Sequence, residues 1–116
     1  MRAGIRLASS FCFGRRQVRR AGLRSPDGVI GVIETGSLDT SLLLRAFANL
    51  PEGTWELVTH PGYADDDLRA ERTRLVESRE RERDLLMSPD IRAFLDRERI
   101  EIINYRQLAE APPRHT

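Results

Sequence analysis

The fold is decided by the stretch Thr54-Trp55-Glu56-Leu57-Val58-Thr59-His60-Pro61-Gly62-Tyr63. Its first half alternates in the manner of a strand and is rich in aromatic and β-branched residues, which predicts a strand over about 55–59. Pro61-Gly62 follows, and it predicts a tight turn because proline has no N–H for a ladder and glycine permits a positive φ. We therefore expect His60 on the last residue of a strand.

His60 has two interpretations at this position. In α/β folds, catalytic side chains are displayed at the carboxyl ends of the strands, which favours an active-site role. A lone histidine is a weak signal, however, and it also suits a residue that caps a strand and bonds a backbone carbonyl. The spacing alone leaves both roles open.

Length and composition restrict the class of protein. The 116 residues allow one domain but not a complete eight-unit α/β barrel, which needs about 250. Hydrophobic residues make up 40% of the chain and charged residues 32%, as in soluble globular proteins, and no apolar run approaches the roughly 20 residues of a membrane span. The single cysteine, Cys12, fits a reducing compartment, so we expect a cytoplasmic protein. His115 is the only other histidine, which leaves no Cys/His cluster for a structural zinc site.

The charge is distributed unevenly. Residues 1–24 hold seven arginines and no acid, whereas residues 25–116 hold 12 arginines and 18 acids, so charges of +7 and −6 make up the net +1. Four arginines would form one face of an N-terminal helix that stops near Gly22: Arg15, Arg16, Arg19 and Arg20. A solvated face is favoured over nucleic-acid binding, because no aromatics are interleaved and the acidic remainder would repel a polyanion.

Two apolar segments precede and follow a predicted helix. Val29–Ile33 is almost wholly apolar, as expected for a strand covered on both faces. Asp39 is a predicted N-cap for a helix over about 40–49, which leads into the strand at Trp55. Strand, helix, strand is the unit that builds parallel sheets.

An acidic run, Asp65–Asp67, opens a long predicted helix that reaches about Met87. Capping of the helix explains three acids at this point better than a metal site, because consecutive carboxylates cannot converge on one ion. Arg79 and Glu82 occupy apolar positions of this helix, where charges are costly unless they are paired. They are expected to pair with each other or with groups at the strand ends.

The remaining chain predicts three elements and a tail. Ser88 caps a helix, residues 100–103 form a third strand, and a short helix runs from Tyr105 through Leu108. The fold class predicted is α/β, with about three short parallel strands alternating with helices. Its divisions are a basic N-terminal helix or remnant at 1–24, an α/β domain at 25–109 and a frayed tail at 110–116.

Several motifs together resemble one known family, the YdjC-like deacetylases. They are Arg20-Ala21-Gly22-Leu23-Arg24-Ser25-Pro26-Asp27, Glu34-Thr35-Gly36-Ser37-Leu38-Asp39, Glu56-Leu57-Val58-Thr59-His60-Pro61-Gly62-Tyr63, Ser78-Arg79-Glu80-Arg81-Glu82 and Ile100-Glu101-Ile102-Ile103-Asn104-Tyr105-Arg106-Gln107-Leu108. The likeness covers about residues 18–109 and is closest to the hopanoid-biosynthesis-associated branch, HpnK, with the chitooligosaccharide branch, ChbG, more distant.

This resemblance implies a hydrolase that removes an acetyl group from an N-acetylated amino sugar or glycolipid with the help of a divalent metal, Mg or Zn, on an incomplete (β/α) barrel. By the same resemblance, His60 is the active-site histidine, and Arg79 and Glu82 support the pocket. Glu56 matches a recurrent acidic position on the same strand.

The family places an aspartate pair and metal-binding histidines before the region that matches here, and residues 1–24 supply none of them. We therefore expect the C-terminal portion of a deacetylase, from a truncated, late-started or split gene, inactive alone because the metal ligands are missing. Its expected partners are the sugar or glycolipid substrate, a missing N-terminal half, or further copies of itself through unpaired strand edges.

Overall fold

Two short parallel strands lie at the centre of the chain. The computed structural model describes residues 11–111. Strand β1 (Gly28–Ile30) pairs with β2 (Trp55–Leu57), with Gly28 opposite Trp55 and Ile30 opposite Leu57. Helix α2 (Thr40–Ala48) connects them, so the predicted strand–helix–strand unit is confirmed.

Strand β1 is shorter than the predicted strand 29–33 because Gly31 turns the chain out of the ladder. Its φ is +90°, in the region that favours glycine. Val32 and Ile33 then lie in a turn and are 57% and 74% exposed, so the expectation that this whole run is covered on both faces is wrong. Thr35 closes the turn by donating its hydroxyl to the Val32 carbonyl at 2.7 Å.

Gly31→Ala is expected to destabilise the fold by about 3 kcal/mol, because a methyl group here combines a left-handed backbone with a steric clash. A Cβ at Gly31 would lie 2.4 Å from the Val58 carbonyl oxygen, whereas one at Gly62 would meet only the flexible Arg79 side chain at 3.4 Å. Gly62→Ala is therefore the matched control, with an expected change of about 1 kcal/mol or less. Urea unfolding of the two variants measures the difference, and equal midpoints would contradict the prediction.

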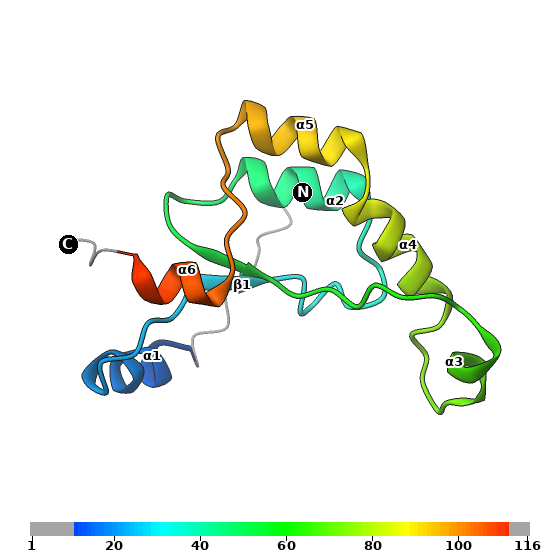
Figure 1. Cartoon of the computed structure of the whole chain (residues 1–116), viewed down its shortest axis with the longest axis horizontal. Coiled ribbons are helices and arrows are strands. Elements are labelled where there is room, and N and C mark those ends of the chain that lie inside the picture. The colour runs from blue at the N-terminus through cyan, green and yellow to red at the C-terminus, as the bar shows by residue number, and fades with distance from the viewer. Residues whose placement is uncertain (1–10, 112–116) are drawn as a thin grey trace, which may run out of the picture.

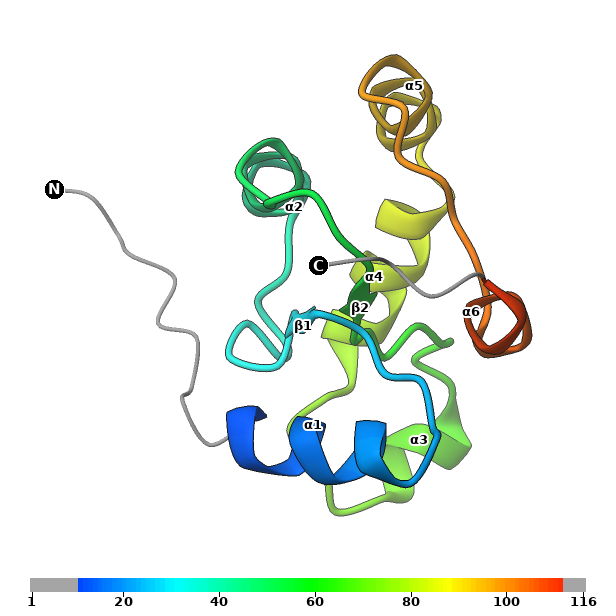
Figure 2. The same cartoon turned by 90° about the vertical axis from the view of Figure 1, so that its left-hand side faces the viewer.

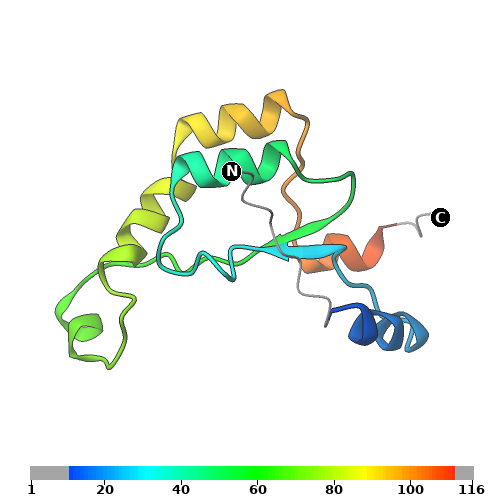
Figure 3. The same cartoon turned by 180° about the vertical axis from the view of Figure 1, so that it is seen from behind.

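The hydrophobic core lies between the sheet and two helices. Helices α2 and α5 (Pro89–Arg97) run side by side over one face of the strands (Figures 1 and 3). Their Phe47 and Phe94 rings stack with centroids 6.4 Å apart. The buried cluster consists of Leu38, Leu43, Leu85, Ile91 and Leu95, with Leu57 and Ile100 packed against it.

The predicted N-cap at Asp39 is confirmed, since its carboxylate accepts the Leu42 N–H at 2.8 Å.

The long helix predicted from Asp65 to Met87 is wrong, because the chain forms two helices. Helix α3 spans Asp66–Ala70 and α4 spans Glu77–Leu86, and α3 lies beyond α4, away from the sheet (Figure 1). Between them, the Thr73 hydroxyl accepts the Leu75 N–H at 3.1 Å, a local bond that competes with helix formation. The capping interpretation of the acidic run is confirmed, because Asp65 accepts the Leu68 N–H.

Residues 100–103 are not a strand, contrary to prediction. The chain leaves α5 through Arg99, which has a φ of +55°, and the Ile100 N–H bonds back to the Leu95 carbonyl at 2.8 Å. Ile102 is 65% exposed. Two strands therefore stand in the described part of the chain, where about three were predicted. The short helix is present as α6 (Tyr105–Glu110), with a capping box between Asn104 and Gln107.

The basic N-terminal helix is present as α1 (Phe11–Arg20), on the opposite side of the strands from α2 and α5 (Figure 2). It ends at Arg20, two residues before the predicted stop at Gly22, whose φ is +75°. The N–H groups of Gly22 and Leu23 bond to the Arg19 and Val18 carbonyls and so close the helix end. Residues 1–10 and most of the predicted tail, residues 112–116, lie outside the described residues. No helix within 11–111 is long and apolar enough to span a membrane.

Candidate active site

His60 lies three residues beyond Leu57, the last residue of β2, so the strand is shorter than predicted and His60 is not on its last residue. The Val58 N–H still donates to the Ile30 carbonyl at 2.9 Å, which continues the ladder one bond past the strand. The chain then runs on without a turn through Pro61 and Gly62, so the predicted tight turn is wrong. The φ of Gly62 is not positive, so this glycine is not used for a left-handed turn.

Residues His60–Ala64, here called the anchored segment, bind α4 through alternate backbone N–H groups. The His60 N–H donates to Glu82 Oε2 at 2.6 Å, the Gly62 N–H to the Arg79 carbonyl at 3.1 Å, and the Ala64 N–H to Glu80 Oε1 at 3.3 Å. In an extended chain, alternate N–H groups point to the same side. Pro61 lies between two of the residues that bond to α4. Because an N–H at this position would point away from α4, the lack of an N–H in proline removes no bond to the helix.

Glu82 is the buried carboxylate of this arrangement. Its residue is 2% exposed, and the bond it accepts from His60 is charge-assisted, which makes it stronger than a bond between neutral groups. Two partners were predicted for Glu82: Arg79, or a group at the strand ends. The structure shows the second, the backbone N–H of His60. The ion pairs of the described residues do not join it to Arg79, whose Nε donates to the Leu75 carbonyl at 2.9 Å.

Arg79 contributes to the same region through its stem. A Cβ built at Gly62 would lie 3.4 Å from Arg79 Cδ, which places the methylenes of this arginine against the anchored segment. Thus three of the four predicted site residues meet: His60 from the end of β2, and Arg79 and Glu82 from one face of α4.

Glu56 is the predicted site residue that stands apart. It lies four residues before His60, a separation of about 13 Å along an extended chain. Its carboxylate accepts a hydrogen bond from the Tyr105 phenol of α6, which raises the pKa of Tyr105. Tyr105 lies in the motif at 100–108, but the sequence does not predict the hydrogen bond between Tyr105 and Glu56.

The raised pKa of Tyr105 has a measurable consequence. Its stabilising contribution is fully present below the phenol's ordinary value of about 10 and is lost as the pH rises through the higher folded value. In a Tyr63→Phe background Tyr105 is the only tyrosine, and its phenolate absorbance should titrate above the ordinary range. Adding Glu56→Gln should bring the midpoint down, and an unchanged midpoint would contradict the contact.

Glu80 and Gly31 were not predicted as site residues. Glu80 belongs to the helix motif at 78–82, but only its neighbours stood in the apolar register. Gly31 interrupts an apolar run, a pattern that marks a close backbone approach. It allows the ends of β1 and β2 to meet at Val58, two residues before His60.

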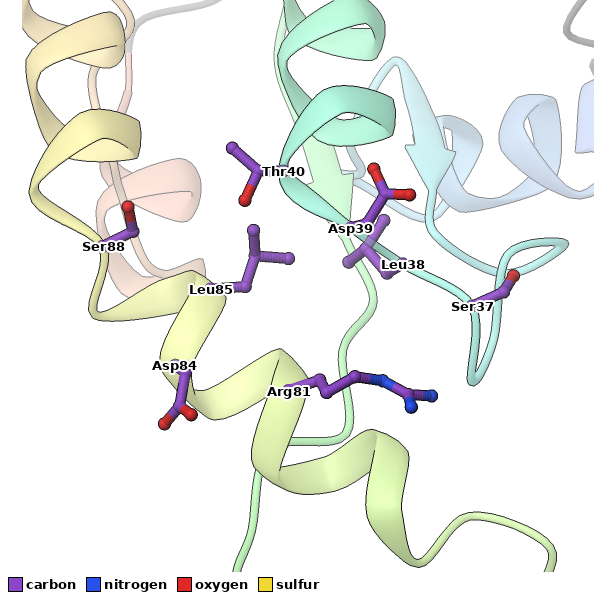
Figure 4. Close-up of a pocket in the computed structure, with 8 residues that line it drawn as sticks. All are labelled: Ser37, Leu38, Asp39, Thr40, Arg81, Asp84, Leu85 and Ser88. Atoms are coloured by element: carbon purple, nitrogen blue, oxygen red, sulfur yellow. The ribbon is translucent and has the colours of Figure 1, made fainter.

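A separate, open depression of about 570 Å³ lies between the start of α2 and α4 (Figure 4). Its lining consists of Ser37, Leu38, Asp39, Thr40, Arg81, Asp84, Leu85 and Ser88. The three charged side chains of the lining are engaged in the fold: Asp39 caps α2, Arg81 donates to the Gly36 carbonyl, and Asp84 accepts from Arg83. None of the predicted site residues lines this depression.

The part of the chain that the structure describes does not fit a divalent metal. It contains no group of three or more His, Cys, Asp or Glu side chains placed to hold an ion. Near His60 the carboxylate is Glu82, and one of its oxygens already accepts a backbone N–H. A catalytic metal site needs about three protein ligands, and a single imidazole with a committed carboxylate does not provide them.

Comparison with known proteins places these residues in a family context. The sequence model of a family described as "YdjC-like protein" matches residues 2–97. The matched range contains Glu56, His60, Arg79 and Glu82 and omits Tyr105. It also contains most of the basic segment 1–24, so the family match extends further toward the N-terminus than residue 18, where the resemblance of the motifs begins.

Three curated relatives carry deacetylase names. The chain is 31% identical over 91 residues to a carbohydrate deacetylase of Thermoanaerobacter pseudethanolicus, covering 78% of this chain and 36% of that protein. It is 42% identical over 53 residues to a carbohydrate deacetylase of Listeria monocytogenes and to carbohydrate deacetylase 1 of Listeria innocua, covering 46% of this chain and 21% of each relative. The chain thus spans about a third or less of these relatives. No solved structure matches it.

Proposed function

The chain belongs to the YdjC-like family, and from this membership we propose that it forms part of a carbohydrate deacetylase and supplies His60 to the active site. The family match over residues 2–97 carries the proposal. The position of His60 three residues beyond the carboxyl end of a parallel strand supports it, because this is the edge at which α/β enzymes place reacting groups.

The chemistry of the proposed reaction explains why a histidine suits this position. Hydrolysis of an acetamide adds water to the carbonyl and breaks the bond to nitrogen, so one proton leaves the water and one reaches the departing amine. Imidazole is the side chain best suited to exchange protons near neutral pH. His60 would act as the general acid or base, while Arg79 and Glu82 hold the segment that carries it.

A divalent metal, Mg or Zn, belongs to the proposal through the family resemblance. When bound, such an ion makes water a stronger nucleophile and polarises the carbonyl. The described residues do not offer its ligands, so we propose that they come from sequence outside these 116 residues. The chain by itself is then expected to be inactive.

The proposed substrate is an N-acetylated amino sugar or a glycolipid that contains one. The names of the relatives support a carbohydrate, and the resemblance of the motifs to the HpnK branch supports a hopanoid-associated glycolipid. A cytoplasmic location and an incomplete (β/α) barrel for the assembled enzyme complete the proposal.

The partner of the chain would be the remainder of such an enzyme. Within the described residues, β1 and β2 pair only with each other, so the outer edge of each is open to a further strand. A second copy of the chain is the competing occupant. Light scattering distinguishes them: a stable monomer argues against self-association and favours a complementary polypeptide.

A chimaera tests the proposed function. The stretch of the Thermoanaerobacter enzyme that aligns with this chain is replaced by the corresponding residues of the chain, and acetate release from N-acetylated chitooligosaccharides is measured with Mg²⁺ or Zn²⁺. We expect deacetylation by the chimaera and none by the 116-residue chain alone. A folded chimaera without activity would overturn the proposal, and turnover by the chain alone would overturn the assignment of the metal ligands to other sequence.

A further inference from the structure

Glu82 has a contact that its family motif does not explain. Burial of a carboxylate is costly unless a charged or hydrogen-bonding partner compensates. Glu82 is 2% exposed, yet the ion pairs of the described residues do not include it. The partner that the structure gives it is the backbone N–H of His60, at 2.6 Å from Oε2.

This contact joins two elements at the point where one of them ends. The last hydrogen bond between the two strands is donated by the Val58 N–H to the Ile30 carbonyl. The next N–H on the same side of the chain is that of His60, and it bonds to Glu82. Glu82 therefore takes the place that a neighbouring strand would otherwise occupy in the hydrogen-bond pattern. It fixes the backbone from which the imidazole extends.

We propose that Glu82 is a positioning residue that holds the main chain of His60 and thereby sets where the imidazole lies. The catalytic meaning of this role rests on the proposed function, whereas the anchoring itself does not. The bonds at Gly62 and Ala64 continue the same attachment, but they use a neutral carbonyl and a longer contact of 3.3 Å. The bond to His60 is the shortest of the three and is accepted by the buried carboxylate, so it dominates the attachment.

Glu80 provides a matched control on the same helix. Its side chain is 43% exposed, and its carboxylate accepts the Ala64 N–H, four residues beyond His60. Glu80→Met removes the same functional group as Glu82→Met and should disturb the segment only near Ala64. Glu82→Gln retains an acceptor oxygen without the charge, which separates the need for a hydrogen bond from the need for a buried apolar side chain.

Amide NMR and hydrogen exchange on the full 116-residue chain test the anchoring. In Glu82→Met, the His60 amide should exchange at least about tenfold faster and its proton resonance should move upfield, while the Val58 amide keeps its protection. Glu82→Gln should restore most of the protection. In Glu80→Met, the Ala64 amide should change and the His60 amide should not.

Two results would overturn the proposal. One is a His60 amide that keeps its wild-type protection and resonance in Glu82→Met. The other applies if Glu82→Met does not fold: the His60 resonance must then move in Glu82→Gln while that of Val58 stays, and an unchanged His60 resonance refutes the anchoring. Because these readouts need no turnover, they succeed or fail independently of the deacetylase assignment.

A kinetic measurement connects the anchoring to catalysis. In the active chimaera, Glu82→Met should lower kcat about ten- to a hundredfold with a smaller change in KM, because a displaced imidazole affects the reaction more than substrate binding. The Glu80→Met chimaera should lose far less of the parent kcat, because the bond it removes lies four residues beyond His60. Equal losses in both variants would show that the helix contributes only general stability and would refute the positioning role.

Discussion

His60→Ala in the deacetylase chimaera is expected to lower kcat by a factor of about 10² to 10⁴, the range that a positioned general acid or base contributes. His60 is half-buried beside α4, and its backbone rather than its side chain makes the contact with Glu82. Removal of the imidazole therefore leaves the anchored segment attached. The loss should appear in kcat, with the thermal unfolding temperature nearly unchanged.

Met87→Ala is the control, since it removes a 75% exposed side chain elsewhere in the same chain. It should retain the activity of the parent chimaera. Acetate release and thermal unfolding are measured for both variants. Equal activity of the two would contradict a catalytic role for His60 and support the alternative of a histidine that serves only the strand end.

Leu43→Ala is expected to lower the free energy of unfolding by about 3–5 kcal/mol. Leu43 has 0% exposure, and it is the most deeply buried member of the core cluster. Truncation removes buried methyl groups and leaves a cavity that the surrounding helices fill only in part. Since small domains are stable by only about 5–15 kcal/mol, this one change threatens the whole fold.

Leu23→Ala is the control for this second prediction, because Leu23 is 63% exposed. Its expected effect is within about 0.5 kcal/mol. Urea unfolding followed by circular dichroism gives both values. A Leu43→Ala variant as stable as Leu23→Ala would show that the cluster around Leu43 does not hold the fold together.

The sequence predicts the elements whose signals are local. The strand at Trp55 is marked by its residue types, Asp39 by its position before an apolar stripe, and Gly22 by its place after a basic helix. Each of these features depends on residues within a few positions, and the structure contains all three.

Elements that depend on competing contacts were predicted incorrectly. Residues 71–76 contain neither glycine nor proline, so nothing local signals that Thr73 and Leu75 replace a helical bond with a side-chain bond. Residues 100–103 have a strand-like composition but form no strand. Instead, the Ile100 N–H bonds to the Leu95 carbonyl, and the Ile100 side chain packs against the core cluster.

In the candidate site, too, the sequence shows the local signals but not the contacts between distant residues. The spacing of Arg79 and Glu82 indicates that two charges lie on a buried face, but it does not select their partner. Only the three-dimensional path of the anchored segment brings the His60 N–H to Glu82 and the Gly62 N–H to the Arg79 carbonyl. The contact between Glu56 and Tyr105 likewise joins residues 49 positions apart.

Chemical rescue is the measurement that tests the role of His60 most directly. Free imidazole is added to the folded His60→Ala chimaera, and acetate release is followed against imidazole concentration. We predict that activity rises with imidazole in this variant and does not rise in Met87→Ala. An inactive but folded His60→Ala chimaera that imidazole leaves inactive would contradict the assignment of proton transfer to His60.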